Sequence, residues 1–344
     1  MDIATRISSA AIQLALGRQN TCKAANELLA HFQTEQLAAY LEYNCLAPLA
    51  FESLVNAECP LASPDLLQSL RQSNIRETIQ QQAHSNAIKA CSQTLTNSGI
   101  KHAFIKGAAA RVSLYTNPLL RPAADVDVLV APTDRTIAVE ALTKNGFQHP
   151  GFDENASHET ILMHGQTEID LHWHLMRPAR LPEHVTTDLL EEVTEVNGLP
   201  VLSPEATATV QLIHPTYTKY VNSPWAKDIR VIDFQRLSKT DLDWTAVAER
   251  IEAYRARTAA WCNLLWFESV SELDVPTSFA QRITPPAIKR AYLKAWIIHG
   301  LTRRFYRKRN LMRLGFTWAA HDRISDAIRA TSSYIGNDKA ASQK

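Results

Sequence analysis

A run of alternating residues, Asp125-Val-Asp-Val-Leu-Val130, constrains the fold of this chain more than any other feature. Successive side chains of a β-strand point to opposite faces, so Asp125 and Asp127 share one face and the valines share the other. The valines predict a face that is buried in a core. The two carboxylates repel each other unless a cation lies between them, and Mg²⁺ prefers such oxygen ligands. The run therefore predicts a sheet strand with one apolar face and one metal-binding face.

The sequence on both sides of this run predicts further strands. Residues 101–105 are typical of a strand that ends at the turn Lys106-Gly107, and a short helix is expected over residues 108–115. A second helix follows the aspartates, and residues 159–175 are expected to form a hairpin around Gly165-Gln166. This order of elements predicts a small mixed sheet covered by helices, a fold of the α/β (α+β) class.

Helical patterns dominate the rest of the chain. We expect an N-terminal helical region (1–98), an α/β core (99–200), a C-terminal helical region (201–335) and a flexible tail (336–344). In the C-terminal region, Ser203-Pro204 is a typical helix start, and Pro215 is expected to interrupt that helix.

Composition indicates a globular protein without a membrane span. Of the 344 residues, 45% are hydrophobic and 21% are charged, and no apolar run is long enough to cross a bilayer. The five cysteines show no metal-ligand spacing, which indicates reduced thiols and a cytoplasmic location. A zinc site is disfavoured for the same reason.

Charge is distributed unevenly along the chain. The segment from Val275 to His321 has ten basic residues, all between Arg282 and Arg313, and no acidic one, whereas the whole chain carries a net charge of only +1. Within this basic segment (282–313), aromatic residues lie among the charges of Arg303-Arg-Phe-Tyr-Arg-Lys-Arg309, as in surfaces that bind single-stranded nucleic acid. RNA, anionic lipid or an acidic partner are candidate ligands. Residues 1–274, which we call the acidic body, carry a net charge of −10. We favour docking of the basic segment, as a solvated helix face, against this acidic body, because the chain as a whole is nearly neutral.

Residues before and after the aspartates supply other parts of a candidate site. The backbone N–H groups and the positive side chain of Lys106-Gly107 suit a phosphate. In the strand Thr167–Trp173, Asp170 and His172 share a face. If this strand neighbours the first, Asp170 completes a three-carboxylate cage for metal ions that activate a hydroxyl and neutralise a departing pyrophosphate.

Each part also has a simpler explanation. Aspartates on an edge strand discourage unwanted pairing, and Lys106 can be an ordinary lysine at a strand end. Arg121 either binds phosphate or pairs with Asp125, and these interpretations weigh equally. His172 either binds phosphate or ribose, or is a hydrogen-bond partner of a carboxylate, which we slightly favour. The functional interpretation is preferred because a Lys-Gly turn, Arg121 and Asp170 accompany the aspartate pair.

Further segments between about residues 35 and 260 accompany these motifs. They are Phe104–Ala108, Leu114-Tyr115, Leu142, Gly146-Phe147, Asp170–Trp173, His214, Lys219, Trp225, Arg230, Asp233 and Leu242–Trp244. Together with the aspartate run, they resemble the uncharacterised nucleotidyltransferase family of the polymerase-β-like superfold. The resemblance implies a polymerase-β-like core flanked by helical regions. The chain differs from the wider superfamily at Gly107-Ala108, where a Gly-Ser or Gly-Gly pair is usual, so the turn offers no hydroxyl.

The resemblance implies transfer of a nucleoside monophosphate from a nucleoside triphosphate (NTP) to an acceptor hydroxyl, with Mg²⁺ or alternatively Mn²⁺. The metal-binding and catalytic residues then fall on Asp125, Asp127 and Asp170. The nucleotide-binding residues fall on Lys106, Gly107, Ala108, Arg121, Lys219 and Arg230, although Arg230 can instead pair with Asp233 three residues later. A small molecule or a protein is favoured as acceptor over nucleic acid. The alternatives are a catalytically idle nucleotide- or partner-binding module on the same fold and, with less support, an RNA-terminal nucleotidyltransferase.

Overall fold

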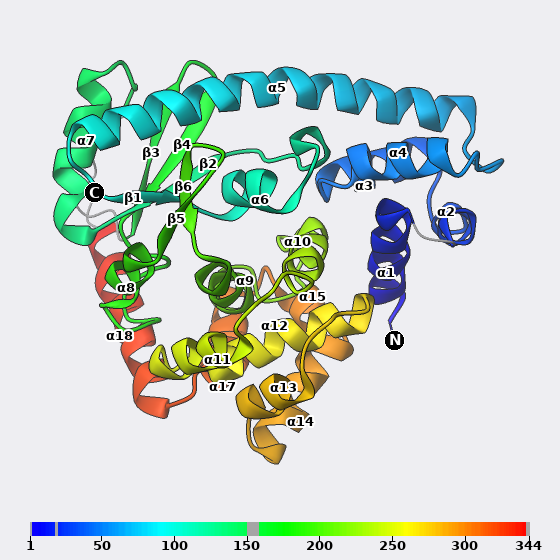
Figure 1. Ribbon diagram of the computed structural model, residues 1–344. Coiled ribbons are helices and arrows are strands. Elements are labelled where there is room, and N and C mark those ends of the chain that lie inside the picture. Colours follow the sequence, from blue (N-terminus) through cyan, green and yellow to red (C-terminus); the bar gives the residue numbers. More distant parts are fainter. Residues whose placement is uncertain (1, 18–19, 150–157, 342–344) are drawn as a thin grey trace.

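A largely helical chain contains a six-stranded sheet that lies toward one side of the molecule, away from the N-terminal helices (Figure 1). The computed structural model describes residues 2–17, 20–149 and 158–341, with side chains up to residue 332. The strands are β1 (His102–Phe104), β2 (Val126–Val130), β3 (Glu159–His164), β4 (Thr167–His172), β5 (Val193–Val196) and β6 (Leu199–Leu202), in the spatial order β3-β4-β2-β1-β6-β5. The expected α/β class with a small mixed sheet is confirmed.

Strand pairing decides which side chains meet on the polar face. β2 runs parallel to β4, and Asp127 lies directly opposite Asp170 in the register. β1 is antiparallel to β2 and parallel to β6, and β3 and β4 form the expected antiparallel hairpin. Side chains alternate across each strand, so this register brings the two carboxylates together on the same face.

The opposite face of the sheet is covered by α5 (Pro64–Asn97) and α7 (Arg135–Lys144). Ile88 of α5 and Leu142 of α7 join the valines of β2 in one buried cluster. Ser63 starts α5, because its side chain accepts a hydrogen bond from the Leu66 N–H and Pro64 occupies the first turn. The apolar half of the aspartate run therefore has the core that its pattern predicts.

The polar face of the sheet is turned toward α9 (Pro204–Thr218) and α10 (Ile229–Leu237) (Figure 1). The N-terminal helices are α1 (Ile3–Leu16), α2 (Thr21–Leu29), α3 (Thr34–Tyr43) and α4 (Ala47–Asn56). In the middle of the chain, α6 (Lys106–Leu114) follows β1 and α8 (Val185–Glu191) precedes β5. The remaining helices are α11 (Trp244–Ala253), α12 (Arg257–Val270), α13 (Thr277–Ile283), α14 (Ala287–Ile298), α15 (Leu301–Phe305), α16 (Arg309–Leu311), α17 (Trp318–Ala320) and α18 (Ile324–Ala341). None of the helices in the described ranges combines the length and the apolar character needed to cross a bilayer.

The local structure differs from the expectation at one helix and contains one hairpin that was not expected. The β5–β6 hairpin was missed, although Asn197-Gly198, with φ of +53° and +75°, is a typical two-residue hairpin turn. Pro215 was expected to interrupt its helix, yet α9 continues through it to Thr218. Pro215 lies in the last turn, and its buried neighbours His214, Thr216 and Tyr217 hold that turn against the protein interior.

Helix α5 buries a histidine whose protonation opposes folding. His84 is 1% exposed, and burial together with the nearby Arg111 guanidinium lowers its pKa to about 4. Because an imidazole in the unfolded chain titrates near 6.5, the unfolded state binds more protons than the folded state between these values. We therefore expect His84 alone to lower the free energy of unfolding by up to about 3 kcal/mol as the pH decreases from about 6.5 to about 4.

Urea unfolding at a series of pH values measures this dependence. The variant His84→Leu is expected to lose less stability than the unmodified chain over the same pH interval. An unchanged pH dependence in H84L would show that His84 does not supply the effect.

Candidate active site

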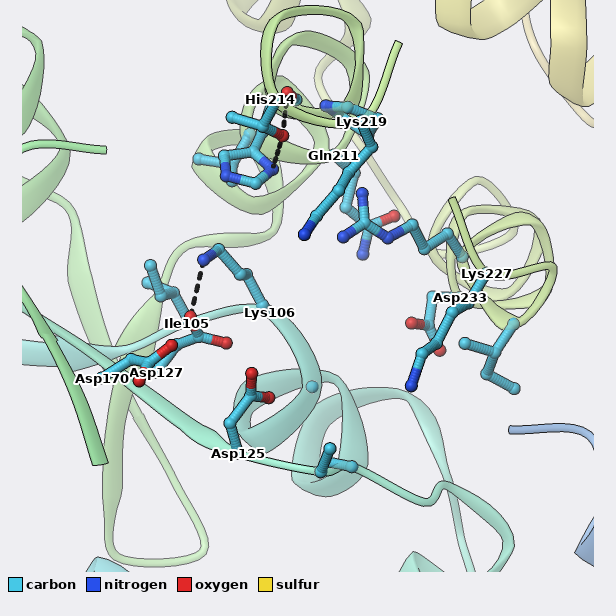
Figure 2. Close-up of a pocket in the computed structure, with 18 of the residues that line it drawn as sticks. Ile105, Lys106, Asp125, Asp127, Asp170, Gln211, His214, Lys219, Lys227 and Asp233 are labelled. Atoms are coloured by element: carbon cyan, nitrogen blue, oxygen red, sulfur yellow. Dashed lines mark hydrogen bonds and ion pairs between the residues drawn. The ribbon is translucent and has the colours of Figure 1, made fainter. Parts of the chain in front are cut away.

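A cleft of about 300 Å³ lies between the polar face of the sheet and helices α9 and α10. Every residue predicted to bind metal or nucleotide lines it, with the exception of Ala108. Figure 2 shows Asp125, Asp127 and Asp170 on the strand side of this cleft, with Lys219 and Lys227 across from them. The cleft thus has an acidic wall and a basic wall.

The acidic wall is built by neighbouring parallel strands. Asp127 of β2 and Asp170 of β4 are register partners, and Asp125 lies immediately before β2. Ligand atoms of Asp127, Asp170 and His172 all lie within 4.8 Å of one another. The Oδ1 atom of Asp170 is buried without a hydrogen-bond partner. A carboxylate oxygen left unsatisfied beside a second carboxylate suits a hard divalent cation such as Mg²⁺.

The carboxylates of the acidic wall repel one another, and this repulsion shifts their pKa values. Burial and the charges of Asp127, Asp125 and Glu159 raise the pKa of Asp170 to about 8. Burial and Asp127 likewise raise the pKa of Asp125. Burial also disfavours ionised Asp127, but Lys106 and the hydrogen bond from His172 outweigh it and hold its pKa below the ordinary value. An added cation would relieve the repulsion that remains.

Lys106 is the present counter-ion of the acidic wall. Its Nζ atom donates to Oδ1 of Asp127 at 2.6 Å and lies 3.2 Å from Nε2 of His172. The residue begins α6 with φ of +53°, a sparsely populated backbone conformation for a side chain with a Cβ. The next position, Gly107, favours glycine, because a Cβ there would lie only 3.0 Å from the Cβ of Ala123. The side chain of Ala108 is buried in the core, so this residue can offer the cleft only its backbone N–H.

His172 connects two carboxylates. Its Nε2 atom lies 2.8 Å from Oδ1 of Asp127, its Nδ1 atom lies 3.0 Å from Oε2 of Glu159, and its side chain is 1% exposed. These contacts agree with the favoured interpretation of His172 as a hydrogen-bond partner. Glu159 lines the cleft and was missed, although the register of the hairpin places it opposite His172 and could have revealed it.

The basic wall is formed by Lys219, Lys227 and Arg230. Within the described residues, none of the three forms an ion pair with a carboxylate. Burial and the charge of Arg230 lower the pKa of Lys219, and burial and Arg121 lower that of Arg230. Partial burial of a cation without a counter-ion is energetically unfavourable, which indicates that a polyanionic ligand binds in the cleft.

Arg121 has a different partner from the one considered in the sequence. Its guanidinium donates to Asp233 of α10 from Nε to both carboxylate oxygens, at 2.8 and 3.0 Å, and from Nη2 to Oδ2 at 2.7 Å. The hydroxyl of Tyr115 donates to the same carboxylate at 2.8 Å. The ion pair therefore joins the residues before β2 to α10, and Asp233 is not the ion-pair partner of Arg230.

Comparison with known proteins gives one extensive match. Residues 30–270 match the profile of a family described as "Uncharacterised nucleotidyltransferase". No curated protein matches the chain. The solution structure of the antibiotic-resistance factor ANT(2'')-Ia is 18% identical, with a TM-score of 0.35 over 54% of this chain and 95% of that one. An antigenic nucleotidyltransferase-like protein from Paracoccidioides brasiliensis is also 18% identical, with a TM-score of 0.31 over 51% of this chain and 90% of that one.

Proposed function

Because the chain belongs to the family of uncharacterised nucleotidyltransferases, as its motifs predicted, we propose that it transfers a nucleoside monophosphate from an NTP to an acceptor hydroxyl in a magnesium-dependent reaction. The observation that carries this proposal is the pairing of two walls across one cleft. Carboxylates on or next to β2 and β4 face cations at the ends of α9 and α10 that have no carboxylate partner among the described residues. A metal–triphosphate complex, which carries both kinds of charge, matches this arrangement.

The acidic wall is the proposed metal site. Asp125, Asp127 and Asp170 would hold Mg²⁺, with Mn²⁺ as an alternative that also accepts the nitrogen of His172. The buried, unpartnered Oδ1 of Asp170 supports this assignment. Bound Mg²⁺ supplies positive charge that orients the phosphates and neutralises the departing pyrophosphate.

The basic wall is the proposed triphosphate site. Lys219 and Arg230 would bind phosphate oxygens, and we add Lys227, which lines the same wall. The backbone N–H groups at Lys106-Gly107 would bind the phosphates from the other side. Since the guanidinium of Arg121 is engaged by Asp233, we assign Arg121 a positioning role rather than phosphate binding.

The transfer step follows from these positions. The acceptor oxygen bonds to the α-phosphorus while the bond from that phosphorus to the pyrophosphate oxygen breaks. Asp170 would orient the acceptor hydroxyl and receive its proton, because its carboxyl group lies in the cluster next to Asp127. Lys219 and Arg230 would hold the pyrophosphate as it leaves.

Titration of the purified chain with each of the four NTPs and Mg²⁺ tests this proposal. We expect saturable binding of at least one NTP, and labelled NTPs in lysate should then reveal the molecule that receives the label. Absence of binding for all four would overturn the proposal. Binding without pyrophosphate release in the presence of lysate would favour the idle nucleotide-binding module.

The unpaired guanidinium of Arg230 allows a separate prediction. Arg230→Met is expected to weaken NTP binding about 10- to 100-fold, because a hydrogen bond to a charged group is lost. The same change should not lower the free energy of unfolding, since Arg230 forms no ion pair within the described residues and the nearby Asp127 and Asp233 pair with Lys106 and Arg121. Calorimetric titration and urea unfolding measure the two effects.

Lys239→Met is the matched control, because Lys239 is exposed just after α10. It should leave both quantities unchanged. Equal NTP affinity in R230M and K239M would exclude Arg230 from the triphosphate site.

A further inference from the structure

Next to the cleft, two aromatic side chains contact each other, and one of them also contacts an arginine of the basic segment. Trp225 lines the cleft and is 41% exposed, and its ring centroid lies 5.0 Å from that of Tyr306 in an edge-to-face contact. Tyr306 belongs to the basic segment, and the Cζ atom of Arg307 lies 5.4 Å from the centre of its ring. We call Trp225, Tyr306, Arg304, Arg307, Lys308 and Arg309 the aromatic–basic surface. Within this surface, Trp225 lines the cleft and Tyr306 contacts Trp225.

The acidic body neutralises only part of the basic segment. Arg282 pairs with Glu252 at 2.8 Å, and Arg303 lies 3.4 Å from Asp2. The expectation that the segment docks against the body holds for these residues. By contrast, the four cations of the aromatic–basic surface are exposed, and no carboxylate in the described part of the chain lies within ion-pair distance of them. Their charge is available to a ligand.

We propose that the aromatic–basic surface binds a single-stranded polynucleotide whose 3′ hydroxyl enters the cleft as the acceptor. The exposed ring of Trp225 can stack on a base, and the cations near it can follow the phosphates, a combination that an acidic peptide or a membrane surface does not require. Trp225 contributes to both the cleft and the surface, so a strand stacked there can extend its end into the cleft that holds the acidic wall. This inference rests on the proposed function and specifies its acceptor, in place of the small molecule or protein that overall charge favoured.

The reaction with this acceptor needs no additional reactant. The terminal 3′ oxygen forms a bond to the α-phosphorus of the NTP, and the bond between that phosphorus and the pyrophosphate oxygen breaks. Pyrophosphate leaves with the electron pair, and the hydroxyl proton passes to Asp170. The polynucleotide is thereby one nucleotide longer.

Fluorescence anisotropy with labelled 12-nucleotide RNA and DNA, over a range of salt concentrations, tests the binding. Arg304→Glu/Arg307→Glu is expected to weaken binding at least about tenfold and to reduce the slope of log affinity against log salt by about 1.4, since each phosphate contact on a single strand contributes about 0.7. Lys89→Glu/Lys144→Glu makes the same charge change on α5 and α7, which cover the opposite face of the sheet, and should have little effect. NTP binding should be retained in both double variants.

An extension assay with labelled NTP completes the test. Oligonucleotides with a 3′ hydroxyl should be extended, and those with a 3′ phosphate should not; the RNA and DNA arms identify the preferred sugar. Absence of polynucleotide binding together with normal NTP binding overturns this inference and leaves the proposed function intact. Binding of acidic peptides or phosphatidylserine vesicles instead, lost in R304E/R307E, also overturns it. Failure of the unmodified chain to bind any NTP overturns the proposed function itself.

Discussion

Asparagine in place of Asp127 is expected to reduce nucleotidyl transfer by about 10²- to 10³-fold, because the acidic wall loses the carboxylate shared by Lys106, His172 and the proposed metal site. Mn²⁺ binding, followed by electron paramagnetic resonance, should weaken in parallel with pyrophosphate release. Asp170→Asn should have an effect of similar size. Since both residues would hold the same ion, the double variant should lose little more than either single one.

Glu168→Gln is the control for these variants. Glu168 lies two residues before Asp170 on β4 and therefore on the same face, but it does not line the cleft. It should retain Mn²⁺ binding and transfer. Unimpaired Mn²⁺ binding in D127N and D170N would contradict a metal site on the acidic wall.

Asparagine in place of Asp233 is expected to lower the free energy of unfolding by about 3–5 kcal/mol. The guanidinium of Arg121 would then be buried without a counter-ion, since the side chains of this pair are only 7% and 4% exposed. Tyr115 would also lose its ionised acceptor. Urea unfolding followed by circular dichroism measures the change.

Two further variants test whether the loss of stability in D233N comes from the buried, unpaired charge of Arg121. Glu252→Gln removes a more exposed ion pair with Arg282 and should cost less than about 1 kcal/mol. Arg121→Met/Asp233→Leu replaces both charges by apolar groups and should recover much of the stability lost in D233N. If D233N is no more destabilising than E252Q, the buried pair does not stabilise the fold.

Local patterns predicted the strands and the acidic wall well, because alternation of side chains is a property of a few consecutive residues. The valines of β2 and the Gly165-Gln166 turn were enough to propose adjacent strands, and the register then brought Asp127 opposite Asp170. The Asn197-Gly198 turn carried a similar local signal for β5 and β6, and it was overlooked.

Contacts between distant segments were not predictable in this way. Asp233 lies 112 residues from Arg121 along the chain, and no periodicity relates the two. The positions of Lys219 and Arg230 facing the acidic wall depend on how α9 and α10 pack, and only family resemblance indicated them. The surface at Trp225 and Tyr306 likewise joins segments that are separate in sequence.

The parallel register of β2 and β4 has a consequence for how such chains can vary in length. Adding or deleting one residue within β4 would turn Asp170 toward the apolar core and bring Ile169 or Leu171 into the cleft. The same change in a connection outside the strands leaves their alternation untouched. Insertions and deletions among functional relatives should therefore avoid residues 126–130 and 159–172 and accumulate in the loops between them.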